Sequence, residues 1–267
     1  MSDPTFYKAP PHSVTVQGSY EPFELQVSRG QIMGHRTVTV VGFNQNVDTQ
    51  WVDISAGGAI AQSGAAIQLS VSSTSADDTA TGTGARTIVI LGLDADYNEI
   101  QEVVTLEGLT PVFTEQFFLR TNKATVLTAG SNGGSVGDIY IGSGTVTDGV
   151  PATIYEDIIF DFNTSLTASY TIPAGYTGYL TYGRFTAAQD IGTTSITSRI
   201  RIVGPNTIPL TVALAAFNNG IAELAVPYPN AIPEKYRITA QAIGSANSNI
   251  ASAYFQILLI KNDLQTA

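Results

Sequence analysis

The stretch from residue 82 to residue 106 most constrains what this chain can fold into. Two short runs of branched apolar residues, 87–91 and 102–106, flank a segment rich in Asp and Asn. Val, Ile and Thr fit a pleated, half-buried surface, whereas Asp and Asn favour chain reversals because their side chains hydrogen-bond to nearby backbone. The pattern therefore predicts a β-hairpin whose turn lies at residues 93–99.

Similar short runs, each bounded by Gly, Asn, Ser or Pro, recur along the rest of the chain. Residues 170–179, YTIPAGYTGY, predict a strand, a Pro-Ala-Gly turn and a second strand. Residues 210–216 are also compatible with a helix, but Pro209 and Asn218 limit such a helix to about two turns, so we predict a strand. The fold class predicted is all-β: two antiparallel β-sandwich domains, each jelly-roll-like.

Composition divides the chain into three parts. Residues 1–30 contain four prolines and are predicted to form an extended arm, since proline fixes φ and removes an N–H donor. The aromatic residues of the arm favour docking on another surface, although a disordered tail is the alternative. Residues 31–147 form the predicted N-terminal β domain and residues 148–267 the predicted C-terminal β-sandwich. The sequence GSGTVTDGVP at 142–151 is the predicted linker.

Charge and cysteine content exclude several classes of function. The net charge is −10 and the sequence pI is about 4.5, which excludes nucleic acid as an expected partner because phosphate binding needs basic surfaces. Hydrophobic residues make up 43% and charged residues 13%, which suits packing against other subunits. With no cysteine there is no disulfide or thiolate metal site. The sequence shows no signal peptide and no apolar run of membrane-spanning length, so we expect synthesis in the cytoplasm and no membrane partner.

No residue pattern in the sequence is strong evidence for a catalytic or metal-binding site. Residues 94–98 have the carboxylate spacing that opens a calcium loop, but Glu99 stands where the loop needs Gly, and Thr105 where it needs a bidentate Glu. Asp77 and Asp78 are equally weak candidates for metal ligands. The two histidines lack a second histidine at ligand spacing, and no Gly-x-Ser-x-Gly elbow is present. We therefore predict no catalytic residue, no metal, no cofactor and no enzymatic activity.

Several of these motifs carry a resemblance to a known group of proteins. The hairpin at 82–106, residues 34–40, residues 119–131, and the order of a YTIPAG turn, Pro233-Glu234-Lys235 and a final apolar strand at 254–260 resemble virion structural proteins of tailed bacteriophages, particularly phages of marine and freshwater bacteria. The resemblance covers most of the chain and implies a particle component without enzymatic activity.

Within that group we expect a decoration or cement protein on the capsid surface, bound to the major capsid protein and to itself as a homotrimer. The alternative is a neck or tail fibre, or an appendage that binds a receptor or host surface glycan through the C-terminal sandwich. Aromatic side chains serve either role, and they also serve core packing. The candidate partner-binding residues are Phe6, Tyr7, Tyr20 and Phe23 in the arm and Tyr176, Tyr179, Tyr182 and Tyr228 in the sandwich.

Overall fold

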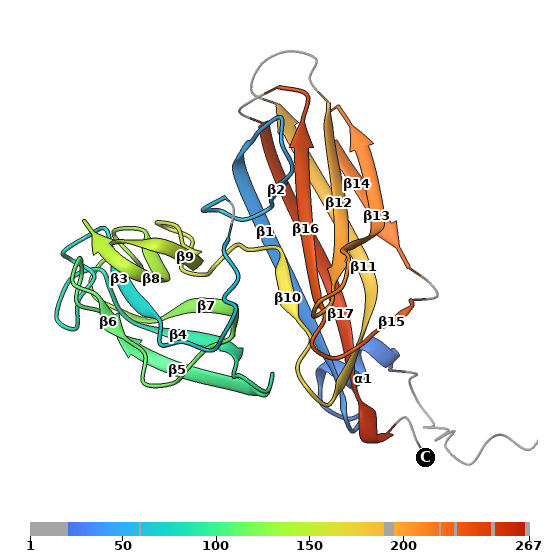
Figure 1. The fold of residues 1–267 in the computed structure, drawn as a ribbon, viewed down its shortest axis with the longest axis horizontal. Helices are drawn as coiled ribbons and strands as arrows, with labels where there is room; N and C mark the ends of the chain where they lie inside the picture. Colours follow the sequence, from blue (N-terminus) through green and yellow to red (C-terminus); the bar gives the residue numbers. More distant parts are fainter. Residues whose placement is uncertain are drawn as a thin grey trace, which may run out of the picture.

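The computed structural model describes residues 21–58, 60–189, 195–218, 220–226, 229–246 and 249–264. Strands dominate this part of the chain, with one short α-helix and one 3-10 turn (Figure 1). All sheet pairings are antiparallel, which confirms the predicted all-β class. Among the described residues, no helix is long and apolar enough to cross a bilayer.

The larger body is a sandwich of two sheets (Figure 1). One sheet has the strand order β1-β17-β11-β14, with β15 added to β11; the other has the order β10-β16-β12-β13, with β2 added to β16. Their bounds are β1 His35–Val47, β2 Val52–Asp53, β10 Ser169–Thr171, β11 Tyr176–Gln189, β12 Ile196–Val203, β13 Leu210–Phe217, β14 Gly220–Ala225, β15 Ala231–Ile232, β16 Arg237–Gly244 and β17 Asn249–Lys261.

β17 shows why these sequences form a sandwich. Its buried and half-buried residues alternate without a break, because successive side chains of a strand point to opposite faces. Phe255, Ile257 and Leu259 point inward and join a core to which both sheets contribute. β17 is a central strand, paired with β1 on one side and with β11 on the other.

The smaller body, which we call the first domain, also consists of two sheets. One has the order β6-β3-β8-β9 and the other the order β5-β4-β7, and they enclose a separate apolar core around Leu69, Ile88, Phe118 and Ile141. The strand bounds are β3 Ser70–Ser73, β4 Ala85–Leu93, β5 Glu99–Thr105, β6 Val112–Phe113, β7 Arg120–Ala129, β8 Ile139–Thr147 and β9 Val150–Ile158.

Strand pairing corrects the predicted division of the chain at 30/31 and 147/148. β1 belongs to the sandwich, since it pairs with β17 over most of its length. The predicted linker at 142–151 lies within the β8–β9 hairpin, where Asp148 and Gly149 both have positive φ. The Gly and Asp residues of this segment thus form a hairpin turn and not a linker. The first domain is instead an insertion between β2 and β10, and Ser55 and Thr167, at the two crossing points, share a hydrogen bond of 3.0 Å.

The predicted extended arm is also wrong for its last part, because Phe23–Ser28 form a helix, α1. Pro22 precedes the helix, and a proline is tolerated there because the first N–H groups of a helix have no intrahelical partner. Residues 1–20 lie outside the described residues. The 3-10 turn Asn262–Leu264 follows β17.

Three predictions that depend only on neighbouring residues are confirmed by the structure. β4 and β5 form the predicted hairpin, and in its turn the carboxylate of Asp94 accepts hydrogen bonds from the backbone N–H groups of Asp96 and Asn98. The Pro-Ala-Gly turn has Gly175 at φ +77° and carries the chain from one sheet of the sandwich to the other. Residues 210–216 lie in β13, as predicted.

Candidate interaction surfaces

A cleft of about 660 Å³ lies between the sandwich and the first domain. β1 contributes Arg36 and residues 38–41 to its lining. The first domain contributes Leu91 and Gly92 from β4, residues 99–101 from β5, and Asn122 and Lys123 from β7, and the lining is completed by residues 164–167 and Tyr170. The volume is within the range of small-molecule sites, and the lining mixes apolar and polar groups.

Arg36 is one of the charged residues that line this cleft, with Glu99 and Lys123. Its guanidinium lies 2.5 Å from Glu99 of the first domain and 4.7 Å from the centroid of the Tyr176 ring. Burial alone would lower the pKa of Arg36, but the hydrogen bond to Glu99 and the nearby negative charge raise it overall. The Nε atom is buried and has no hydrogen-bond partner among the described residues.

A second surface lies where the two sheets of the sandwich end side by side. β13 and β14 are the terminal strands of their sheets, and β13 alternates small inward residues, such as Ala213, with large outward ones. We call the outward set the β13–β14 surface, and its side chains are 47% to 83% exposed. It consists of Ile208, Leu210, Val212 and Leu214, whereas Ile221 on β14 faces outward from the other sheet, since its neighbours Ala222 and Leu224 pack toward the core.

The first domain also exposes large apolar side chains. They include Val103 on β5, Phe113 on β6, Phe117, and Leu127 on β7, which are 53% to 60% exposed. Single exposed apolar residues are common, so the number on one small domain is the informative feature.

Arginines on the outer face of the second sheet are engaged within the chain. Arg199 lies 3.7 Å from the Trp51 ring centroid, and Arg199 and Arg201 both donate hydrogen bonds to the amide oxygen of Gln241. The Gln241 amide in turn donates to Asp53. The side chains that these two arginines contact are thus neutral or aromatic.

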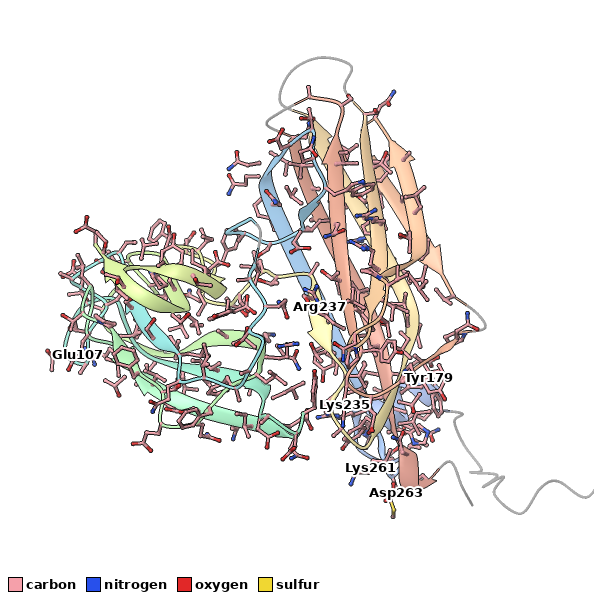
Figure 2. All side chains as sticks on the ribbon, in the orientation of Figure 1. Glu107, Tyr179, Lys235, Arg237, Lys261 and Asp263 are labelled. Atoms are coloured by element: carbon pink, nitrogen blue, oxygen red, sulfur yellow. The ribbon has the colours of Figure 1, made fainter. Side chains whose placement is uncertain are left out.

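Arg237 follows on β16, at the side of the sandwich that faces the first domain (Figure 2). Burial lowers its pKa, and although Asp53 opposes this effect, the positive charges of Arg120 and Arg201 add to it. Arg237 therefore lies within reach of two other positive charges and one carboxylate.

The structure separates the aromatic residues that the sequence grouped as partner-binding. Phe6, Tyr7, Tyr20 and Tyr228 lie outside the described residues. Phe23 is exposed in α1, and its ring meets the edge of His35 at 6.1 Å. Tyr176, Tyr179 and Tyr182 all lie on β11, and Figure 2 shows Tyr179 near the lower end of the sandwich.

These β11 tyrosines do not form one stacking platform. Tyr176 lies beneath Arg36, whereas Tyr182 donates a hydrogen bond to Glu223 and packs edge-on against Tyr254 at 5.9 Å. No ring contact joins Tyr176, Tyr179 and Tyr182 to one another within the described part of the chain. Their roles as partner-binding residues remain predictions.

Sequence reasoning missed a buried acidic pair on β9, Glu156 and Asp157. Glu156 accepts a hydrogen bond from the Thr167 hydroxyl, and burial raises its pKa to about 8. Burial also raises the pKa of Asp157 to about 6. Both residues occupy a strand of ordinary composition, so only the long-range packing around them could reveal their burial.

The weak metal candidates have structural roles instead. The buried carboxylate of Asp78 accepts four hydrogen bonds, from the Ser73 hydroxyl and from the backbone N–H groups of Ala85, Val136 and Gly137. Asp94 caps the β4–β5 turn. Within the described ranges no three His, Asp or Glu side chains are grouped as metal ligands would be.

Comparisons with known proteins give no family. No family model matches the chain, and no curated protein matches it in sequence. Among solved structures it is similar to the VP2 subviral particle of infectious bursal disease virus, at 10% identity and a TM-score of 0.19, covering 85% of this chain and 72% of that one. T=1 particles derived from infectious bursal virus give 14% identity, a TM-score of 0.20, and coverages of 85% and 69%. TM-scores this low do not establish a shared fold.

Proposed function

We propose that this chain is a non-enzymatic structural subunit of a virus particle and, more specifically, a decoration or cement protein on the outside of a tailed-phage capsid. The observation that supports the proposal is the β13–β14 surface, where four large apolar side chains are exposed beside two strands that end their sheets among the described residues. Such surfaces are costly to leave in water and mark sites of contact with other proteins.

The β13–β14 surface would hold copies of this chain together in the predicted homotrimer. Full burial of one large aliphatic side chain contributes about 1.5–3 kcal/mol before the entropy cost of association is deducted. Four partly exposed side chains would therefore supply part of the driving force for an interface. The exposed apolar residues of the first domain, Val103, Phe113, Phe117 and Leu127, would then contact the major capsid protein.

Burial of apolar side chains between coat subunits would explain how such a protein stabilises a capsid. Each added contact must be broken before the shell can open, so apolar area removed from water raises the resistance of the particle to internal DNA pressure. No chemical step is required of the protein in this role.

Stoichiometry in purified particles tests the proposal. The amount of this chain relative to the major coat protein, measured by quantitative mass spectrometry, should approach the number of capsid lattice sites. A ratio lower by about an order of magnitude would reject decoration and favour the neck or tail-fibre alternative, since fibres are present in small multiples of three or six. Absence from the particle would overturn the virion assignment altogether.

A substitution tests the surface itself. Leu214→Ser removes an outward side chain of β13 and should lower both the trimer fraction in light scattering and incorporation into particles. Met33→Ser, which changes a side chain 81% exposed outside this surface, is the matched control and should change neither. Equal trimer fractions for the two variants would show that the β13–β14 surface is not the interface between copies.

A further inference from the structure

Three arginines share the outer face of the second sheet of the sandwich. Arg199 and Arg201 lie two residues apart on β12, and Arg237 lies on the neighbouring strand β16. The register of these strands places Arg199 opposite Gln241 and Arg201 opposite Thr239. Because side chains two residues apart on a strand share a face, all five residues point to the same side of the sheet.

The guanidinium groups of Arg199 and Arg201 converge on one neutral acceptor. The amide oxygen of Gln241 lies 3.1 Å from Nε and 2.7 Å from Nη2 of Arg199, and 3.2 Å from Nη1 of Arg201. A guanidinium carries five N–H donors, so these contacts leave most donors of both side chains available to a ligand.

Negative charge is scarce around these arginines. Within the described part of the chain, Arg199, Arg201 and Arg237 form no ion pair with Asp or Glu. The carboxylate of Asp53 accepts a hydrogen bond from the Gln241 amide instead, at 3.0 Å. Burial lowers the pKa of Arg199, and the positive charge of Arg201 lowers it further. Like charges are thus held close together, in a chain whose net charge is −10.

A buried hydroxyl on the same face also lacks a partner. Thr239 is 1% exposed, and its Oγ1 atom has no hydrogen-bond partner among the described residues. Buried polar groups normally have a partner, and an unpaired one indicates a missing ion, water or ligand. Guanidinium groups are donors only, so the neighbouring arginines offer this hydroxyl nothing to donate to, whereas an anion would accept from it.

The site is ordered before any ligand binds and is still open to solvent. Arg199, Arg201 and Arg237 are half-buried. The guanidinium of Arg199 is held by the Gln241 amide and by the Trp51 ring, whose centroid lies 3.7 Å away. Side chains that are already ordered lose less conformational entropy on binding, and partial burial strengthens their attraction for an anion.

We propose that Arg199, Arg201 and Arg237 form a binding site for one oxyanion group, supplied by free phosphate or by a carboxylate of a partner protein. Arginine forks match the oxygens of both groups with paired hydrogen bonds. The net negative charge of the chain disfavours an extended polyanion such as nucleic acid. A protein docked on the β13–β14 surface could supply the carboxylate, because Arg199 lies opposite Leu214 in the β12–β13 register.

Trp51 provides the readout, because it is the single tryptophan of the chain and lies against Arg199. Sodium phosphate added to the full chain at neutral pH should change the Trp51 fluorescence with a saturable dependence on concentration. Sodium chloride at equal ionic strength is the control and should give no saturable change, since it supplies screening without an oxyanion. An equal response to the two salts, or no response to phosphate, would overturn the proposal.

Arg201→Gln tests the site without removing the contact between Arg199 and the reporter. It deletes one positive charge and should raise the phosphate concentration at half-saturation by about tenfold or more. Arg184→Gln makes the same change on β11 of the other sheet and should leave that concentration unchanged. Equal values for the two variants would overturn the assignment. Titration of the natural chain needs no variant, so the proposal stays testable even if Arg201→Gln does not fold.

Thermal unfolding gives a second readout that does not depend on Trp51. A ligand that binds only the folded state raises the melting temperature by mass action. Because phosphate also stabilises proteins by exclusion from their surface, the deciding comparison is between the two variants. The rise caused by phosphate should be smaller in Arg201→Gln than in Arg184→Gln, and equal rises would overturn the proposal.

Sodium acetate, titrated in the same way, distinguishes the two sources of the oxyanion. Half-saturation by phosphate at a lower concentration than acetate supports free phosphate as the ligand, and the reverse order supports a carboxylate of a partner protein. Failure of both anions to saturate the signal would overturn the proposal. None of these experiments requires a virus particle, so their outcome is independent of the proposed capsid role.

Discussion

The guanidinium of Arg36, on β1, and the carboxylate of Glu99, on β5, form an ion pair of 2.5 Å that connects the sandwich to the first domain. The two side chains are 39% and 43% exposed, so water screens the attraction. We expect Glu99→Gln to lower the free energy of unfolding by less than about 1 kcal/mol. Urea denaturation checks this value.

Arg36→Ala should cost more than Glu99→Gln, because it also removes the packing of the guanidinium on Tyr176. Equal losses for the two variants would show that the contact with Tyr176 contributes nothing.

Glu156 should make stability depend on pH. Its folded pKa, about 8, exceeds the ordinary value of 4.5, so the folded state holds the proton more tightly than the unfolded state. The free energy of unfolding should therefore fall as the pH rises from about 4.5 to about 8, by on the order of a few kcal/mol. Urea midpoints measured at several pH values across this window check the slope.

Glu156→Gln should abolish the part of this fall between about pH 6 and pH 8, while retaining an acceptor for the Thr167 hydroxyl. Below about pH 6 the fall should become shallower but remain, because the raised pKa of Asp157 acts with the same sign. A natural chain with equal midpoints at both ends of the window would contradict the assignment.

Asp78 should be among the most sensitive positions of the first domain. Asp78→Ala leaves four donors without their acceptor in a buried site, and we expect a loss of about 3–5 kcal/mol in the free energy of unfolding. Asp77→Ala, at the exposed neighbouring position, should change it by about 0.5 kcal/mol or less. Similar losses for the two variants, measured by thermal or urea unfolding, would contradict this role.

Gly42 permits the close approach of β1 to the crossing segments. A Cβ atom at this position would lie 2.2 Å from the carbonyl oxygen of Ile54 and 2.4 Å from the Cβ of Ala168. Gly42→Ala should therefore cost about 1–3 kcal/mol. Gly64→Ala meets nothing within 4 Å and should be neutral or slightly stabilising, so a comparison of the two melting temperatures isolates the steric effect.

Features that depend on a few neighbouring residues were predictable from sequence. The β4–β5 hairpin, the turn at Gly175 and strand β13 follow from the local preferences of Asp, Asn, Pro, Gly and β-branched residues. The all-β class followed for the same reason.

Features that depend on distant partners were not predictable. The alternation of apolar and polar residues in β1 would suit a strand of either domain. Only the pairing of β1 with β17 assigns it to the sandwich. Glu156 and Asp78 have the composition of exposed strand and loop residues, and their burial depends on neighbours far along the chain. The outward direction of Val212 and Leu214 likewise requires knowing that Ala213, between them, faces the core.

The position of β17 between β1 and β11 has a consequence for synthesis. Neither β1 nor β11 can complete its ladder until the segment 249–261 has emerged from the ribosome, although the inserted domain has all its strands long before. The first domain can thus fold during translation, whereas the sandwich must wait with two unprotected edges. The interval before β17 arrives is the period when nascent chains of this protein are most exposed to mispairing with one another.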